Sequence, residues 1–119
     1  MRDFRTLNVW TRAHALAVET YKVTKAFPKE ELYGLVSQMR SASVSIPANI
    51  AEGCGRTGER EFRHFLEIAA GSSAELEYHL LLAHDLGFLA QADYDNLDAR
   101  VTEVKRMLAG FLEAIKGDR

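Results

Sequence analysis

The 119-residue sequence has few of the features that mark a secreted, membrane-spanning or metal-binding protein. Cys54 is its one cysteine, which excludes a disulfide within the chain and disfavours a cysteine-based metal site. No apolar run approaches the ~18 residues that a membrane span requires. Residues 1–5 also lack the apolar stretch of a signal peptide. These absences together predict a cytoplasmic protein.

The net charge is also small, and prolines are few. The formal net charge is -2, the isoelectric point is about 6.1, and there are two prolines. This balance supplies no overall field that would attract nucleic acid or a membrane surface. The charge is uneven, however, at +3 over residues 1–63 and -5 over residues 64–119. The length and the apolar content of 47% predict one domain over residues 1–119, with a single core.

Apolar residues recur at helical spacing in four segments, and no segment has the pattern of a β-hairpin. The first helix is expected to end before Pro28, because the residue that precedes a proline is disfavoured in the α conformation. Gly87 has the position of a left-handed residue that ends the third helix. The short connections predict an all-α, antiparallel, up-down-up-down four-helix bundle. The expected helices cover residues 7–27, 28–53, 57–86 and 93–116.

The second expected helix carries polar residues where a buried face should be apolar. Its residues 32, 35, 39, 42, 46, 49 and 53 follow alternating steps of three and four, which is the spacing of a helix that packs in a bundle. Asn49 lies on this buried line, Glu52 lies beside it, and Pro47 interrupts the helix interior. Buried polar groups are costly unless they are paired. The segment therefore predicts a local polar network.

We expect that network to contain Arg40, Asn49, Glu52, Ser72 and Glu75. An antiparallel third helix would bring Arg40 level with residues 72–75, and Glu52 level with Arg60. The expected ion pairs are Arg40 with Glu75, and Glu52 with Arg60 or Arg63. One interpretation is a structural network that fixes helix register. The alternative is a ligand-binding or catalytic site.

Catalytic motifs are incomplete. Glu61 and His64 match one Glu-x-x-His element of di-iron bundles, but such sites need two elements and two further glutamates. Glu75 and His79 lie one turn apart, without a second Glu-x-x-His element. Cys54 lies near Arg56 but has no evident histidine base. We predict no enzyme activity, and no catalytic, cofactor-binding or metal-binding residues.

Several stretches have distinctive combinations of residues, and the central one is Ser45-Ile46-Pro47-Ala48-Asn49-Ile50-Ala51-Glu52-Gly53. The others are at positions 4–10, 27–35, 35–40, 63–66 and 70–76. Together they resemble the family of 23S rRNA intervening-sequence proteins over most of the chain, to about residue 87. That family is similar to the accessory variability protein of diversity-generating retroelements, a basic pentameric bundle that works with a reverse transcriptase and nucleic acid.

The resemblance implies a homo-oligomeric bundle, with a pentameric ring as the expected assembly and no enzymatic activity. Family members often carry two consecutive arginines where this chain has Arg40-Ser41, so one positive charge is missing here. The residues themselves favour a non-catalytic scaffold or adaptor. The alternative is a nucleic-acid-associated accessory protein, with candidate phosphate contacts at Arg56, Arg60 and Arg63. Either partner, protein or nucleic acid, is compatible with the pattern.

Overall fold

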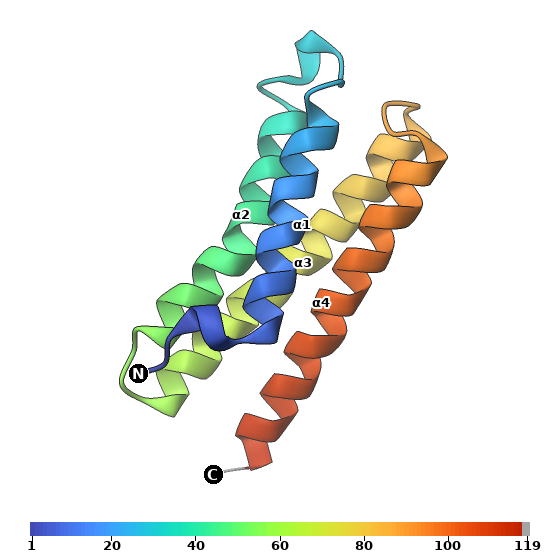
Figure 1. The fold of residues 1–119 in the computed structure, drawn as a ribbon. Coiled ribbons are helices and arrows are strands. Elements are labelled where there is room, and N and C mark those ends of the chain that lie inside the picture. Colours follow the sequence, from blue (N-terminus) through green and yellow to red (C-terminus); the bar gives the residue numbers. More distant parts are fainter. Residues whose placement is uncertain (118–119) are drawn as a thin grey trace.

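The protein is a bundle of four long helices, seen in a computed structural model that describes residues 1–117 (Figure 1). The bundle is elongated, at 46 × 22 × 20 Å. Successive helices run in opposite directions, and α4 returns to lie against α1. The predicted all-α four-helix bundle is confirmed. Its elements are η1 (Phe4–Thr6), α1 (Asn8–Thr24), η2 (Lys29–Glu31), α2 (Leu35–Cys54), α3 (Glu59–Asp85) and α4 (Gln91–Gly117).

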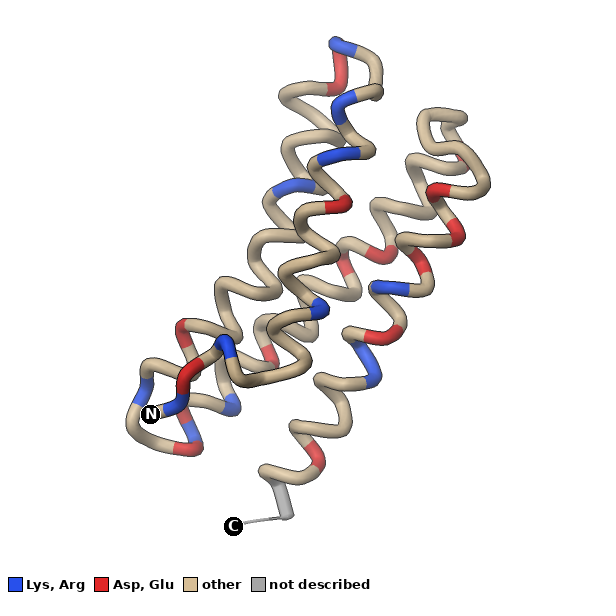
Figure 2. The backbone as a smooth tube through the Cα atoms, in the orientation of Figure 1, with Lys and Arg blue, Asp and Glu red and all other residues tan. Residues whose placement is uncertain are grey.

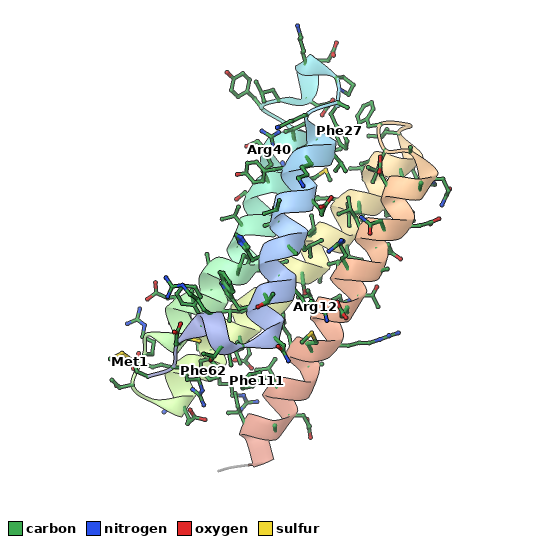
Figure 3. All side chains as sticks on the ribbon, in the orientation of Figure 1. Met1, Arg12, Phe27, Arg40, Phe62 and Phe111 are labelled. Carbon is green, nitrogen blue, oxygen red and sulfur yellow. The ribbon has the colours of Figure 1, made fainter. Side chains whose placement is uncertain are left out.

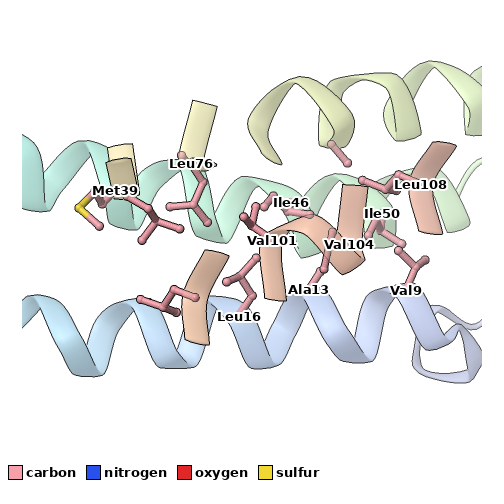
Figure 4. Close-up of a cluster of buried hydrophobic side chains, with 14 of the residues drawn as sticks. Val9, Ala13, Leu16, Met39, Ile46, Ile50, Leu76, Val101, Val104 and Leu108 are labelled. Carbon is pink, nitrogen blue, oxygen red and sulfur yellow. The ribbon is translucent and has the colours of Figure 1, made fainter. Parts of the chain in front are cut away.

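The core is a continuous column of aliphatic side chains along the bundle axis (Figure 4). Each helix supplies residues three and four positions apart, because that spacing places side chains on one helix face. Burying a Leu, Ile or Val stabilises the fold by roughly 1.5–3 kcal/mol each. Fully buried members include Leu16, Ile46, Leu76, Val101 and Leu108.

The second helix begins later than the sequence predicted. Residues 28–34 contain the short 3-10 helix η2 and a turn, and α2 starts at Leu35. Gly34 has a backbone conformation outside the helical region, and Glu31 Oε1 accepts a hydrogen bond from the Leu35 N–H at 3.3 Å. Leu32 was expected on the buried line but is 46% exposed. The apolar spacing was correct from Leu35 onward and misleading before it.

The connection from α3 to α4 is fixed by a Schellman motif. Gly87 has a φ of 81°, as the sequence predicted, and this left-handed geometry is favourable for glycine. The N–H of Phe88 donates to the Ala83 carbonyl at 2.9 Å, and that of Gly87 donates to the His84 carbonyl at 3.0 Å. The Phe88 ring then packs on Phe27 from the α1–α2 connection. The two connections at this end of the bundle thus support each other.

The N-terminal residues lie across the opposite end of the bundle. The Arg2 N–H donates to the Cys54 carbonyl at 2.9 Å, which ties the chain start to the end of α2. The Arg2 guanidinium stacks on Phe62 and forms an ion pair with Glu59 at 2.7 Å. Phe62 meets Phe111 of α4 at the same level (Figure 3). None of the helices described over residues 1–117 has an apolar stretch long enough to cross a membrane.

Candidate functional site

The polar network expected along α2 exists in a smaller form than predicted. Ser45 and Ser72 hydroxyls lie 2.8 Å apart across the α2–α3 contact. The Asn49 side-chain amide donates to the Ser45 hydroxyl at 2.9 Å and to the Ser45 carbonyl at 2.8 Å. Asn49 and Ser72 are therefore brought together through Ser45. These hydrogen bonds favour one alignment of α2 along α3.

Arg40 belongs to a different contact. Its Nε donates to the Thr24 hydroxyl at 2.9 Å, and its guanidinium lies over the Tyr21 ring, so it packs against α1. The predicted Arg40–Glu75 pair is wrong. Counting residues fixes the level along the axis but not the direction around it. Arg40 and Ser45 are five residues apart, which turns them about 140° from each other on the helix.

The other predicted pair is also replaced by more local contacts. Glu52 pairs with Arg56 at 2.9 Å, one turn later, instead of with Arg60 or Arg63. Glu75 lies 3.5 Å from His79 on its own helix. Both carboxylates are more than half exposed, so they needed no partner from a neighbouring helix. Their contacts resemble ordinary surface pairs and carry little stability.

The contrast between Asn49 and Glu52 predicts different effects of mutation. Asn49→Leu removes both amide hydrogen bonds to Ser45 and should lower the free energy of unfolding by about 0.5–1.5 kcal/mol. Glu52→Ala removes an exposed pair and should change it by about 0.5 kcal/mol or less. Urea unfolding of both variants beside the wild type measures this. Equal losses in the two variants would contradict a network centred on Ser45.

The candidate phosphate-contacting arginines surround the α2–α3 turn. A surface pocket of about 400 Å³ lies there, lined by Arg56, Arg60, Glu61, His64 and Phe65. Arg56 is held by Glu52 at 2.9 Å and approaches Glu61 at 3.9 Å. Its guanidinium also stacks on the Phe65 ring. Two of the three candidate arginines thus share one pocket, and one of these two is already neutralised by carboxylates.

Arg63 lies outside that pocket. Its side chain is 21% exposed, and its Nε lies 3.9 Å from a Glu67 carboxylate oxygen. Within residues 1–117, Arg60 forms no ion pair. Arg60 is therefore the arginine of the three whose charge is most available to an external anion.

Glu61, His64 and Cys54, weighed for catalysis in the sequence, lie either on the exposed side of α3 or buried at the end of α2. Glu61 and His64 are both exposed on the outer side of α3, away from the buried face that carries Phe62. Cys54 is 1% exposed, and burial is the main cause that raises the pKa of its thiol. A raised pKa disfavours the reactive thiolate. Over residues 1–117, no three His, Cys, Asp or Glu side chains gather closely enough to hold a metal ion.

His79 is a buried titratable side chain that the sequence did not single out as unusual. It is 5% exposed on α3, and its Nδ1 is buried without a hydrogen-bond partner. Burial lowers the pKa of His79, and the nearby Glu75 carboxylate partly opposes that effect. The neutral imidazole is thus the form that suits the folded protein.

His79 predicts a loss of stability in mild acid. An unfolded histidine titrates near pH 6.5, and the folded pKa is lower, so the unfolded state binds the proton more readily. The contribution is complete above about pH 6.5 and is lost as pH falls toward the folded pKa. Unfolding at pH 7.5 and pH 5.5 should show a smaller acid-dependent loss in His79→Leu than in the wild type. His14→Gln, at an exposed position, is the control, and identical losses in all three proteins would refute this role.

Two outer faces carry exposed apolar side chains that the sequence analysis missed. The α1–α2 face contains Val18, Tyr21, Lys25, Arg40 and Val44. The α3–α4 face contains Tyr78, Leu81, Asp85, Asp95 and Asp98.

The members of both faces could have been found in the sequence. Within each helix they recur at three- and four-residue steps on the polar side of that helix.

Fold and surface together define a small up-and-down helical bundle. Its arginine-lined pocket and its two partly apolar faces lie on the outer surface. The chain belongs to the 23S rRNA-intervening sequence protein family, whose family model matches residues 5–110. The fold is similar to that of a crystal structure from Bacteroides thetaiotaomicron, a protein with unknown function from the S23 ribosomal protein family. That likeness has a TM-score of 0.79 at 23% identity and covers 87% of this chain and 97% of the other. No curated protein sequence matches the chain.

Proposed function

We propose that the protein is a non-catalytic helical bundle that self-associates and serves as an interaction scaffold or adaptor. The observation that carries this proposal is the exposure of large apolar side chains on its two outer faces. Val18, Tyr21 and Val44 are 39%, 42% and 42% exposed, and Tyr78 and Leu81 are 59% and 44% exposed. Grouped apolar side chains on a surface are typical of protein–protein contact sites.

The family resemblance supports the same proposal and adds an assembly size. It implies a ring of five copies, in which each subunit would cover part of its apolar surface with a neighbour. A ring also repeats any weak binding site several times, and simultaneous contacts raise the overall affinity for an extended partner. A scaffold of this kind needs no reacting group of its own.

Light scattering coupled to size exclusion tests self-association directly. The expected result is a species several times the 13.3 kDa mass of one chain, with five copies as the proposed size. A single peak at the mass of one chain, across the concentrations used, would overturn the scaffold proposal in this form.

Nucleic-acid binding is the second candidate function, and the pocket at the α2–α3 turn favours it. Arg60, which forms no ion pair within residues 1–117, presents its guanidinium there beside Arg56 and His64. The similarity of the family to the accessory variability protein, inferred from the sequence motifs, points in the same direction. Against it, Glu52 and Glu61 lie within 4 Å of Arg56 and reduce the positive charge available to phosphates. One subunit should therefore bind weakly, and an assembly more strongly.

Fluorescence anisotropy with labelled single-stranded RNA and DNA tests this second function. If it holds, Arg60→Ala weakens binding and lowers the slope of log K against log salt by about one. The Arg56→Ala, Arg60→Ala, Arg63→Ala triple variant should weaken binding further. Arg12→Ala, which removes a guanidinium bound to Glu103 on the α1–α4 side, is the matched control. Binding that is absent at ~0.15 M salt would favour the scaffold without nucleic acid.

A further inference from the structure

The α1–α2 face combines apolar side chains with unpaired positive charge. Tyr21 lies under the Arg40 guanidinium at 4.7 Å, so the two helices present one continuous surface. Val18 and Lys25 flank Tyr21 one turn to either side, and Val44 follows Arg40 by one turn. Within residues 1–117, neither Lys25 nor Arg40 forms an ion pair. Both charges are available to a partner.

The α3–α4 face has the opposite charge. Residues 64–99 contain seven Asp and Glu and no Lys or Arg. Around Tyr94, partial burial raises the pKa of the phenol, and the nearby carboxylates of Asp98, Asp85, Glu77 and Asp95 raise it further. Of these carboxylates, Glu77 is paired with Lys105 at 2.7 Å, while the other three have no Lys or Arg partner in the part of the chain described.

The two faces lie on opposite sides of the bundle and at the same end of it. In the four-helix arrangement, the α1–α2 edge is across the core from the α3–α4 edge. In Figure 2, blue residues outnumber red ones along the upper halves of α1 and α2, and red residues predominate along the upper halves of α3 and α4. The labelled Arg40 lies at this level in Figure 3. Two parallel copies placed side by side would therefore bring the faces together at matching height.

We propose that the α1–α2 face of one copy docks on the α3–α4 face of the next copy, with Lys25 and Arg40 against Asp85, Asp95 and Asp98. Tyr21, Val18 and Val44 pack against Tyr78 and Leu81 within the same contact. This inference rests on the proposed self-association and names its surface. Electrostatic complementarity selects this pairing, since either face against itself would juxtapose like charges.

The proposed contact is heterologous, because the two docking faces differ. A heterologous contact leaves one unused face at each end of any row of copies. A rotation between neighbours that divides the full circle evenly would close the row into a ring and would satisfy every face. One repeated interface of this kind covers the exposed apolar side chains of both faces, without a second kind of partner.

Charge reversal on each face tests the contact. Lys25→Glu with Arg40→Glu makes both faces acidic, and Asp95→Lys with Asp98→Lys makes both faces basic. Each double variant should raise the dissociation constant on the order of 100-fold or more. The chain that carries all four changes restores opposite charges and should recover the assembly. Arg60→Glu, at the other end of the bundle, is the control and should leave the mass unchanged.

Light scattering of these variants separates the two proposals. A monomeric wild type overturns self-association itself. An assembled wild type whose double variants keep their mass, or whose fourfold variant stays dissociated, overturns the docking faces alone. Circular dichroism confirms that each variant is helical. If Arg40→Glu disturbs the contact with Thr24 and unfolds the chain, Lys25→Glu alone should still weaken the assembly, and an unchanged dissociation constant would refute the proposal.

Discussion

Phe62→Ala should lower the free energy of unfolding by about 3–5 kcal/mol, a large loss for the truncation of one side chain. The ring is fully buried near the N-terminal end of α3. It meets Phe111 of α4 edge-on at a centroid distance of 5.4 Å and carries the Arg2 guanidinium on its face at 4.0 Å. Its loss leaves a cavity and also releases the N-terminal residues from the end of the bundle.

Thermal and urea unfolding measure this effect. A loss of that size corresponds to a fall in Tm of roughly 10–20 °C for a chain of this length. Tyr33→Ala is the control, because the Tyr33 side chain is 93% exposed and its removal should change the stability by about 0.5 kcal/mol or less. A Phe62→Ala variant as stable as Tyr33→Ala would contradict the close packing of Phe62 at this end of the bundle.

Gly53→Ala should have the second large effect on stability, because it overpacks the contact between α2 and α3. A Cβ at Gly53 would lie 3.0 Å from the Phe65 Cβ and 3.2 Å from the Phe62 carbonyl oxygen. Neither atom is the free end of a flexible side chain, so α2 and α3 must move apart by a few tenths of an ångström. We expect the free energy of unfolding to fall by about 1–3 kcal/mol.

Gly71→Ala provides a matched control of opposite sign. Gly71 lies inside α3, and a Cβ there would meet nothing within 4 Å. Alanine is the better helix former, so this variant should gain about 0.5–1 kcal/mol. Urea unfolding of the two variants compares one substitution at a crowded and an open position. The same sign at both positions would show that helix propensity, and not the close approach of α2 and α3, controls Gly53.

The sequence predicted the fold well because helical periodicity is a local property. The buried lines of α3 and α4, the left-handed Gly87 and the antiparallel order all follow from residues within a few positions of each other. The start of α2 was placed seven residues too early, because the apolar Leu32 continues the pattern while the backbone at Gly34 leaves the helix. Spacing reports where side chains would lie in a helix, and not whether the helix forms.

The polar contacts were predicted less well, because they depend on direction around each helix. Asn49 and Ser72 meet through Ser45, whose short hydroxyl bridges the α2–α3 contact. The sequence predicted a contact of Arg40 with α3, but Arg40 packs on α1, and Glu52 pairs with Arg56 just beyond the end of its own helix. Long charged side chains reach several neighbours, so a residue count along two axes selects the level but not the partner.

The attachment of Arg2 to the end of α2 makes the single thiol a built-in chemical reporter. The Cys54 side chain is buried at the end of α2, where the Arg2 N–H bonds to the Cys54 carbonyl. The charged groups that act on the thiol are Arg2, Asp3 and the terminal amino group. A thiol reagent can reach the buried sulfur only when the structure around it opens. The rate of alkylation at Cys54 therefore reports the opening of the structure around the end of α2, where the N-terminal residues are attached.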